Sequence, residues 1–172
     1  MLAANIIFPV RYSKWVANLV HVWKKNGDIC ICVDFRDLNR VSVKDYFPLP
    51  FMDAILQQVT GSELMSMLDG FSGYNQVFIN PQDRYKTTFT MRWGTYAYHR
   101  MPFGLINVST TFQRAMHIAF DDLIGVIIQI FLEDLTVHSQ QARRSLRTFA
   151  ASFLAMSSIR YLAKYNQVHL RY

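Results

Sequence analysis

The feature of the sequence that most restricts the fold is a pair of short, largely apolar runs that end in acidic residues. Leu64–Leu68 is followed directly by Asp69, and Val126–Leu132 is followed by Glu133 and Asp134. Apolar runs of about four to eight residues are typical of buried strands. They are far shorter than the roughly 20 residues that a membrane-spanning helix needs. The sequence therefore predicts a compact sheet with carboxylates at its edge and no membrane span.

A β-hairpin is predicted in the first part of the chain. Val16–Trp23 and Ile29–Phe35 are rich in β-branched and aromatic residues, and the segment between them contains Asn26 and Gly27. An Asn-Gly pair supplies the positive φ angles that a tight hairpin turn needs. The two runs are therefore expected to pair with each other.

Two helices are predicted by apolar residues at helical intervals. The first covers Phe51–Val59, and the second begins at Asn107 or Ser109 as the N-cap and runs to about Leu123. Their expected buried residues are Met52, Ile55, Leu56 and Val59 on the first helix, and Phe112, Met116, Ala119, Phe120 and Leu123 on the second. Further strands are expected at Tyr74–Ile79, Thr87–Arg92, Tyr96–Arg100 and Leu135–Val137.

This order of elements predicts an α+β fold, in which helices cover one face of an antiparallel sheet. The palm domains of polymerases and ferredoxin-like RNA-binding modules share this split βαβ outline, so the fold alone does not decide the function. The 172 residues suffice for one compact core. We expect residues 1–60 to form the hairpin and a helix, residues 61–139 the sheet with the acidic residues, and residues 140–172 a basic tail.

The excess of positive charge and the two cysteines are each confined to one segment. The formal net charge is +6, and residues 139–172 contain six Lys or Arg and no Asp or Glu. Such a tail can hold phosphates, although a charge run is more often a solvated surface. Cys30 and Cys32 should share one face of a strand. Their spacing does not fit a zinc site and favours small apolar residues in a reducing compartment.

The acidic residues favour a metal site. Glu133 and Asp134 fall at a predicted hairpin bend, where Asn-Gly would be the usual choice, and adjacent carboxylates repel each other unless a cation is close. Asp69 is expected at the same edge of the sheet. Carboxylate oxygens suit Mg²⁺, and two such ions about 4 Å apart can activate a primer 3′-hydroxyl and neutralise the leaving pyrophosphate. A solvated acidic turn is the alternative.

The residues also resemble a known family over about Ile7 to Ser139. The chain is similar to the fingers and palm of reverse transcriptases from gypsy-like long-terminal-repeat retrotransposons, especially those of plants. The blocks that carry the resemblance are Phe8-Pro9-Val10, Trp15 to Val20, Lys24 to Gly27, Cys32 to Arg36, Leu38-Asn39, Tyr46 to Pro50, Leu68 to Gln76, Lys86-Thr87, Met101 to Asn107, Thr111 to Arg114 and Phe131 to Leu135.

The resemblance implies roles for individual residues. Asp69, Glu133 and Asp134 would be the catalytic residues and the ligands of two Mg²⁺ or Mn²⁺ ions. Tyr74 would pack beneath the incoming sugar and disfavour a 2′-hydroxyl, with a core aromatic as the alternative. The implied nucleotide-binding residues are Lys24, Lys25, Gly70, Phe71, Tyr74, Phe103 and Gly104. The implied template and primer residues are Gln113, Arg114, Phe131 and Leu132, where Gln113 and Arg114 are either structural or in contact with the template.

Several positions depart from the family pattern. Glu133 replaces an aspartate, Phe131 replaces a tyrosine, and Cys30 stands where the family has an arginine that clamps the triphosphate. The segment Val108–Thr110 replaces small residues. Beyond Ser139 the family pattern is hard to trace, and the acid-free tail is what a shifted reading frame would produce. These departures favour weak activity or none.

Three functions follow from this sequence. The first is an RNA-directed DNA polymerase fragment of a retrotransposon Pol polyprotein, with an RNA or DNA template, a primer and a dNTP as partners and the remaining Pol domains absent from the chain. The second is an inactive remnant, at most a passive nucleic-acid binder. The third, an RNA-binding ferredoxin-like module, is disfavoured by the acidic cluster. The resemblance implies an intracellular location, in the cytoplasm within virus-like particles, with the nucleus as the alternative.

Overall fold

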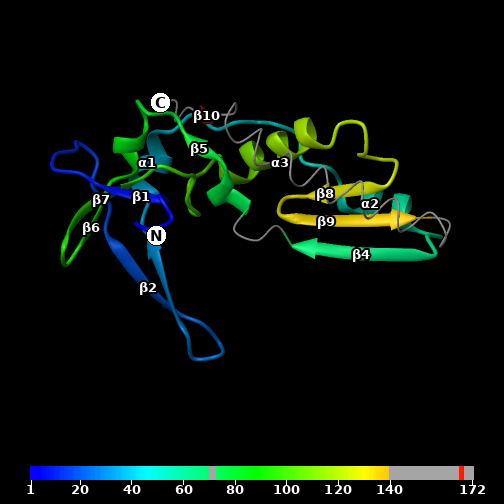
Figure 1. Cartoon of the computed structure of the whole chain (residues 1–172), viewed down its shortest axis with the longest axis horizontal. Helices are drawn as coiled ribbons and strands as arrows, with labels where there is room; N and C mark the ends of the chain where they lie inside the picture. The colour runs from blue at the N-terminus through cyan, green and yellow to red at the C-terminus, as the bar shows by residue number, and fades with distance from the viewer. Residues whose placement is uncertain (70–72, 140–166, 169–172) are drawn as a thin grey trace.

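The computed structural model describes residues 1–69, 73–139 and 167–168 (Figure 1), without the side chain of Asp69 or those of residues 167–168. Gly70, Phe71 and nearly all of the basic tail therefore lie outside the described residues. Within the described part of the chain, no helix has the length and apolar character to cross a membrane. The fold is the predicted α+β type, with mostly antiparallel sheets and few helices.

The sheet that carries the acidic residues has three antiparallel strands in the order β4-β9-β8. These strands are β4 (Leu64–Asp69), β9 (Asp134–Ser139) and β8 (Ile128–Phe131). Alternate residues of β8 and β9 point to one face, because side chains alternate along a strand. The buried side chains on that face are Ile128, Ile130, Leu135 and Val137.

Helix α3 (Val108–Ala119) packs against β8 (Figure 1). Phe112, Met116 and Phe120 are buried, as their helical spacing predicts. The helix ends at Ala119, four residues before the predicted end, because Phe120 already leaves the helical conformation and begins the turn toward β8. Burying these three large side chains contributes on the order of 5–8 kcal/mol to the packing of α3.

The predicted hairpin near the N-terminus is confirmed. Its strands are β2 (Leu19–Trp23) and β3 (Ile29–Val33), and Gly27 adopts a φ of 89° in the turn. Cys30 and Cys32 lie on one face of β3 with their Sγ atoms 3.7 Å apart. The hairpin projects away from the rest of the molecule (Figure 1), so most of its side chains are exposed.

A second three-stranded sheet contacts the hairpin through β2 and β6. It consists of β1 (Ile7–Pro9), β7 (Gly94–Tyr98) and β6 (Phe89–Met91), all antiparallel. The predicted strand over Tyr74–Ile79 is wrong in its first half. Gly73–Gln76 is the 3₁₀ helix η1, and only β5 (Phe78–Ile79) is extended. The reason is tertiary packing, because the Tyr74 ring is buried against Phe103 and Phe112. A hydrogen bond from the Val77 N–H to the Tyr74 carbonyl closes a turn of η1.

Four short elements complete the described chain. They are α1 (Arg36–Val41), α2 (Met52–Val59), η2 (Arg84–Thr87) and β10 (Gln167–Val168), which pairs in parallel with β5. The predicted apolar stripe of α2 is half wrong. Ile55 and Val59 are buried, but Met52 and Leu56 are 47% and 54% exposed, because only one line of side chains on this short helix faces the core.

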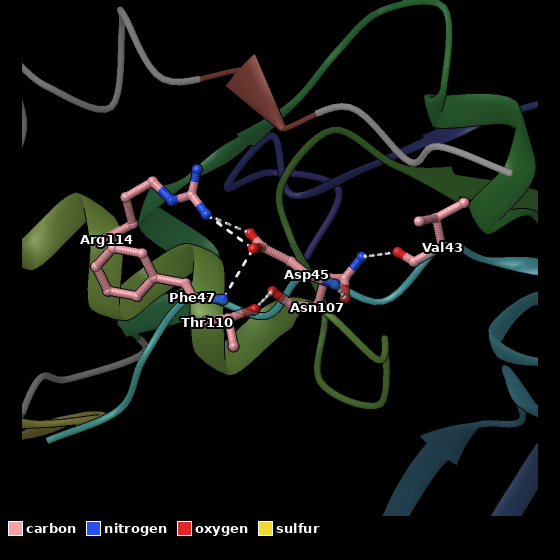
Figure 2. A network of polar contacts seen from close by, with 6 residues as sticks. All are labelled: Val43, Asp45, Phe47, Asn107, Thr110 and Arg114. Atoms are coloured by element: carbon pink, nitrogen blue, oxygen red, sulfur yellow. Dashed lines mark hydrogen bonds and ion pairs between the residues drawn. The ribbon is translucent and has the colours of Figure 1, made fainter.

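A polar network fastens the chain before α2 to the first turns of α3 (Figure 2). Asn107 accepts a hydrogen bond from the Asp45 backbone N–H and donates one to the Val43 carbonyl. Asn107 does occupy the N-cap position, but its side chain makes these contacts and does not cap the helix. Arg114 Nη2 donates to both carboxylate oxygens of Asp45 at 2.8 and 2.6 Å, and its guanidinium lies 4.8 Å from the centre of the Phe47 ring.

Replacing Arg114 tests this network. We expect Arg114→Ala to lower the free energy of unfolding by about 1 kcal/mol, a value reduced by the partial exposure of the pair. The control is Arg36→Ala, because Arg36 pairs with Asp34 only two residues away and is largely exposed. Urea titrations should show a smaller effect for the control, and equal effects would contradict the structural role of Arg114.

The acid stability of the fold should depend on His138. This side chain is buried and lies 3.3 Å from both Ser62 Oγ and Gln129 Nε2. Burial lowers the pKa of His138, so the folded state binds a proton less readily than the unfolded state. Stability is therefore complete above the unfolded pKa near 6.5 and falls as the pH decreases below it.

Urea unfolding at pH 7.5 and 5.5 measures this effect. We expect a loss of at most about 1 kcal/mol from His138 between these pH values, and His138→Gln should remove that part of the loss. His99 adds to the same trend, since its pKa is lowered by partial burial and by Arg84 and Arg100. The exposed His21 provides the control, and a His21→Gln variant should keep the full pH dependence.

Candidate active site

The acidic residues meet at one end of the sheet β4-β9-β8. Asp69, the last residue of β4, lies directly opposite Asp134, the first residue of β9, and Asp134 also pairs with Phe131 of β8. The bend between β8 and β9 is therefore Leu132-Glu133. The prediction that Glu133-Asp134 forms the bend is wrong by one residue, because Asp134 takes part in both ladders.

The bend has an unusual backbone. Leu132 has a φ of 56°, in the left-handed region where a side chain with a Cβ atom costs roughly 1–2 kcal/mol. Its N–H donates to Oε1 of Gln113 at 2.7 Å. Gln113 Nε2 in turn donates to the Ile130 carbonyl at 3.1 Å. A side chain of α3 thus contacts the hairpin on both sides of Phe131.

Glu133 of the bend and Asp134 of β9 act electrostatically on Tyr74. Burial raises the pKa of Tyr74, and the charges of Glu133 and Asp134 raise it further, while a hydrogen bond with Ser109 opposes these effects. Glu133 is half-buried with its Oε1 atom inaccessible, whereas Asp134 is exposed. The charges of Glu133 and Asp134 therefore influence the Tyr74 hydroxyl electrostatically.

This donor set fits hard divalent cations. Two carboxylates one residue apart, with a third acidic residue opposite in the ladder, repel one another unless a cation is near. Oxygen ligands of this kind are those that Mg²⁺ and Mn²⁺ prefer. Among the side chains that the structure describes, which exclude that of Asp69, no three His, Cys, Asp or Glu form a group able to hold a metal ion.

Tyr74 is fixed from three sides. It is buried, and its ring contacts Phe112 and Phe103 edge-on with centroid distances of 5.2 and 4.8 Å. Its hydroxyl lies 3.4 Å from Ser109 Oγ. Tyr74 is thus a core aromatic by burial, and the same position brings its hydroxyl under the influence of the acidic residues.

The loop that contains Phe103 and Gly104 is held by α1. Asn39 Nδ2 donates to the Gly104 carbonyl at 2.7 Å, and Asn39 Oδ1 accepts from the Ile106 N–H at 2.8 Å. Gly104 has a φ of 96°, which favours glycine. Phe103 remains 58% exposed beside Tyr74. The structure therefore places Phe103, Gly104 and Tyr74 in one region.

Other predicted residues are not brought to this region. Lys24 and Lys25 lie at the tip of the hairpin β2-β3, which stands apart from the sheet β4-β9-β8 in Figure 1. Arg114 faces Asp45 and Phe47. Gln113 has no exposed surface, which favours the structural alternative for this residue.

Three residues that were not predicted as site residues carry contacts that the sequence analysis did not foresee. Asn39 holds the loop of Gly104, while Asp45 and Asn107 hold the segment before α2. Asn39 and Asn107 fall within the blocks that carry the family resemblance, which is the signal that could have identified them. Asp45 lies outside those blocks and had no such signal.

Comparison with known proteins identifies the family. The family model described as "Reverse transcriptase (RNA-dependent DNA polymerase)" matches residues 24–162. This chain belongs to the reverse transcriptase family. The match extends beyond Ser139, which argues against a shift of the reading frame at that point.

Several curated reverse transcriptase relatives are similar in sequence. The chain is 34% identical over 117 residues to the retrovirus-related Pol polyprotein from transposon gypsy of Drosophila melanogaster, covering 68% of this chain and 11% of that protein. It is 33% identical over 109 residues to an RNA-directed DNA polymerase homolog of Oenothera berteroana, covering 63% of this chain and 77% of the relative. It thus spans about a tenth of the gypsy polyprotein and most of the plant protein.

Solved structures of reverse transcriptases share the fold. The foamy viral protease-reverse transcriptase dRH in complex with double-stranded DNA matches with a TM-score of 0.82 and 17% identity, over 92% of this chain and 27% of that chain. The native prototype foamy virus protease-reverse transcriptase matches with a TM-score of 0.77 and 17% identity, over 92% of this chain and 21% of that one. The expected palm and fingers fold is confirmed.

A substitution at Gly73 tests how closely this residue approaches the Phe112 ring, which also packs against Tyr74. A Cβ atom at Gly73 would lie 2.8 Å from Cζ of Phe112, so one of them must move. We expect Gly73→Ala to cost about 1–3 kcal/mol of unfolding free energy by overpacking. In a Phe112→Leu background the ring is absent and the cost of Gly73→Ala should become smaller. An unchanged cost in that background, measured by urea denaturation, would contradict the contact.

Proposed function

We propose that this chain is the fingers and palm part of an RNA-directed DNA polymerase from a retrotransposon Pol polyprotein. The observation that supports this most directly is the register of the sheet, which sets Asp69 opposite Asp134 with Glu133 in the adjoining bend. The reaction would join a dNTP to a primer 3′-hydroxyl on an RNA or DNA template. By analogy with transposon polyproteins, it would take place in the cytoplasm.

The acidic residues would hold two metal ions. Asp69, Glu133 and Asp134 supply the oxygen ligands, and Mg²⁺ or Mn²⁺, when bound, neutralises charge on the triphosphate and the attacking oxygen. The chain's own residues bind and orient the substrates. These residues would promote the reaction mainly by positioning the primer and the dNTP, as phosphoryl transfer requires.

The surrounding residues would bind the nucleotide and the primer. Tyr74 would pack against the sugar and exclude a 2′-hydroxyl, beside Phe103 and Gly104. Phe131 ends β8 and Leu132 is the first residue of the bend, and both would face the primer end. Lys24 and Lys25, in the turn of the hairpin β2-β3, would bind the triphosphate.

Two substitutions favour a second candidate, an inactive member of the family that at most binds nucleic acid passively. Glu133 carries one more methylene than aspartate, which moves its carboxylate by more than about 1 Å and can cost on the order of 100-fold in rate. Cys30 contacts Cys32 and provides only a weak thiol donor where the family has arginine. We therefore expect little unaided polymerisation by the unchanged chain.

Primer extension on an RNA template tests both candidates. With Mg²⁺ or Mn²⁺, a Glu133→Asp, Cys30→Arg variant should extend the primer on the order of 100 times faster than the unchanged chain, because the carboxylate and the guanidinium regain their positions. Adding Asp134→Asn to this variant is the matched control and should abolish extension.

The outcomes separate the two candidates. Robust extension by the unchanged chain would reject the inactive candidate. If both versions fold by circular dichroism and neither extends a primer, the active candidate is rejected for this chain.

A further inference from the structure

Gln113 is an amide that the core encloses completely. Its side chain has 0% exposure, and it extends from α3 toward the acidic bend. Oε1 accepts from the Leu132 N–H at 2.7 Å, and Nε2 donates to the Ile130 carbonyl at 3.1 Å. Both amide atoms are therefore engaged with the backbone of one hairpin, and the burial leaves no surface for a template.

The first of these hydrogen bonds is made by a residue with an unfavourable backbone conformation. Leu132 adopts a φ of 56°, although leucine strongly prefers negative φ. Hairpins with two-residue loops normally place Gly, Asn or Asp at such a position. The bend therefore does not owe its conformation to its own sequence, and a tertiary contact has to stabilise it.

The conformation of Leu132 determines the orientation of the two carboxylates that follow it in the chain. Glu133 follows Leu132 directly, and Asp134 is the next residue and the first of β9. A rotation at Leu132 would redirect Glu133 and disturb the pairing of Asp134 with Phe131. The orientation of both carboxylates thus depends on the torsion that Gln113 stabilises.

We propose that Gln113 is a positioning residue for the metal-binding carboxylates of Glu133 and Asp134. It fixes the left-handed conformation of Leu132 from the neighbouring helix, and so sets the geometry at which the cations bind. The metal-binding part of this inference rests on the proposed function, whereas the fixing of the bend does not.

The contacts of the residues on either side of Gln113 help to hold this part of α3 in place. Phe112 packs against Tyr74, and Arg114 contacts Asp45. Three consecutive residues of α3 thus hold the Tyr74 ring, the acidic bend and the segment before α2. Because α3 is anchored by its buried stripe, Gln113 acts from a rigid base.

The test compares Gln113→Met with the unchanged chain. Methionine has nearly the same length and volume but neither accepts from Leu132 nor donates to Ile130 with comparable strength. The control is Gln57→Met on α2, because Gln57 is exposed. Two quantities are measured, namely hydrogen exchange of the Leu132 amide and the affinity for Mn²⁺ by water-proton relaxation. Asp134→Asn establishes which part of the Mn²⁺ signal belongs to this site.

We expect Gln113→Met to reduce the protection of the Leu132 amide at least 10-fold and to weaken Mn²⁺ binding at least 5-fold, with no change in Gln57→Met. Leu132→Gly, added to Gln113→Met, should recover part of the Mn²⁺ affinity, because glycine adopts positive φ without strain. If Gln113→Met fails to fold, Gln113→Asn, whose amide is too short to reach the bend, replaces it with the same expectations.

Three results would overturn the proposal or part of it. Protection and affinity within 2-fold of the unchanged chain would refute it. Uniform loss of protection over all amides with unchanged Mn²⁺ affinity would show that Gln113 is merely structural and would also refute it. If the unchanged chain binds no Mn²⁺, the proposed function fails. Hydrogen exchange alone then decides whether Gln113 fixes the bend. A loss of amide protection confined to residues 132–134 supports this role, and any other pattern overturns it.

Discussion

The packing of α3 against β8 is the contact on which the candidate site depends. Phe112, Met116 and Phe120 enter the core from one side of this helix, and Ile128 and Ile130 of β8 are buried with them. Each such side chain contributes roughly 1.5–3 kcal/mol when fully buried. With the helix fixed in this way, short polar contacts from its first turns can determine where the acidic bend and Tyr74 lie.

The parts of the fold that local chemistry specifies were predictable from sequence. The Asn26-Gly27 pair predicted the hairpin β2-β3, and the helical spacing of Phe112, Met116 and Phe120 predicted α3. The segment after Gly73 was not predictable, because its β-prone residues adopt a 3₁₀ turn that tertiary packing of Tyr74 stabilises. The same holds for Met52, whose exposure depends on how α2 meets the core.

The candidate site was likewise only partly predictable from the sequence. The meeting of Asp69 with Asp134 followed from acidic residues at the ends of apolar runs. The exact bend did not, because a leucine at positive φ contradicts the local preference of the sequence and is stabilised by a glutamine far away along the chain. Violations of local preference of this kind are expected at functional sites, where surrounding structure compensates for them.

The thiol pair on the exposed hairpin has a practical consequence. Cys30 and Cys32 are the two cysteines of the sequence, and their sulfur atoms are 3.7 Å apart on one face of β3. A reagent with two thiol-reactive arms would therefore attach at a single place and with little rotational freedom. Spectroscopic probes mounted in this way would report the orientation of the fingers hairpin relative to the palm, without any cysteine having to be added or removed.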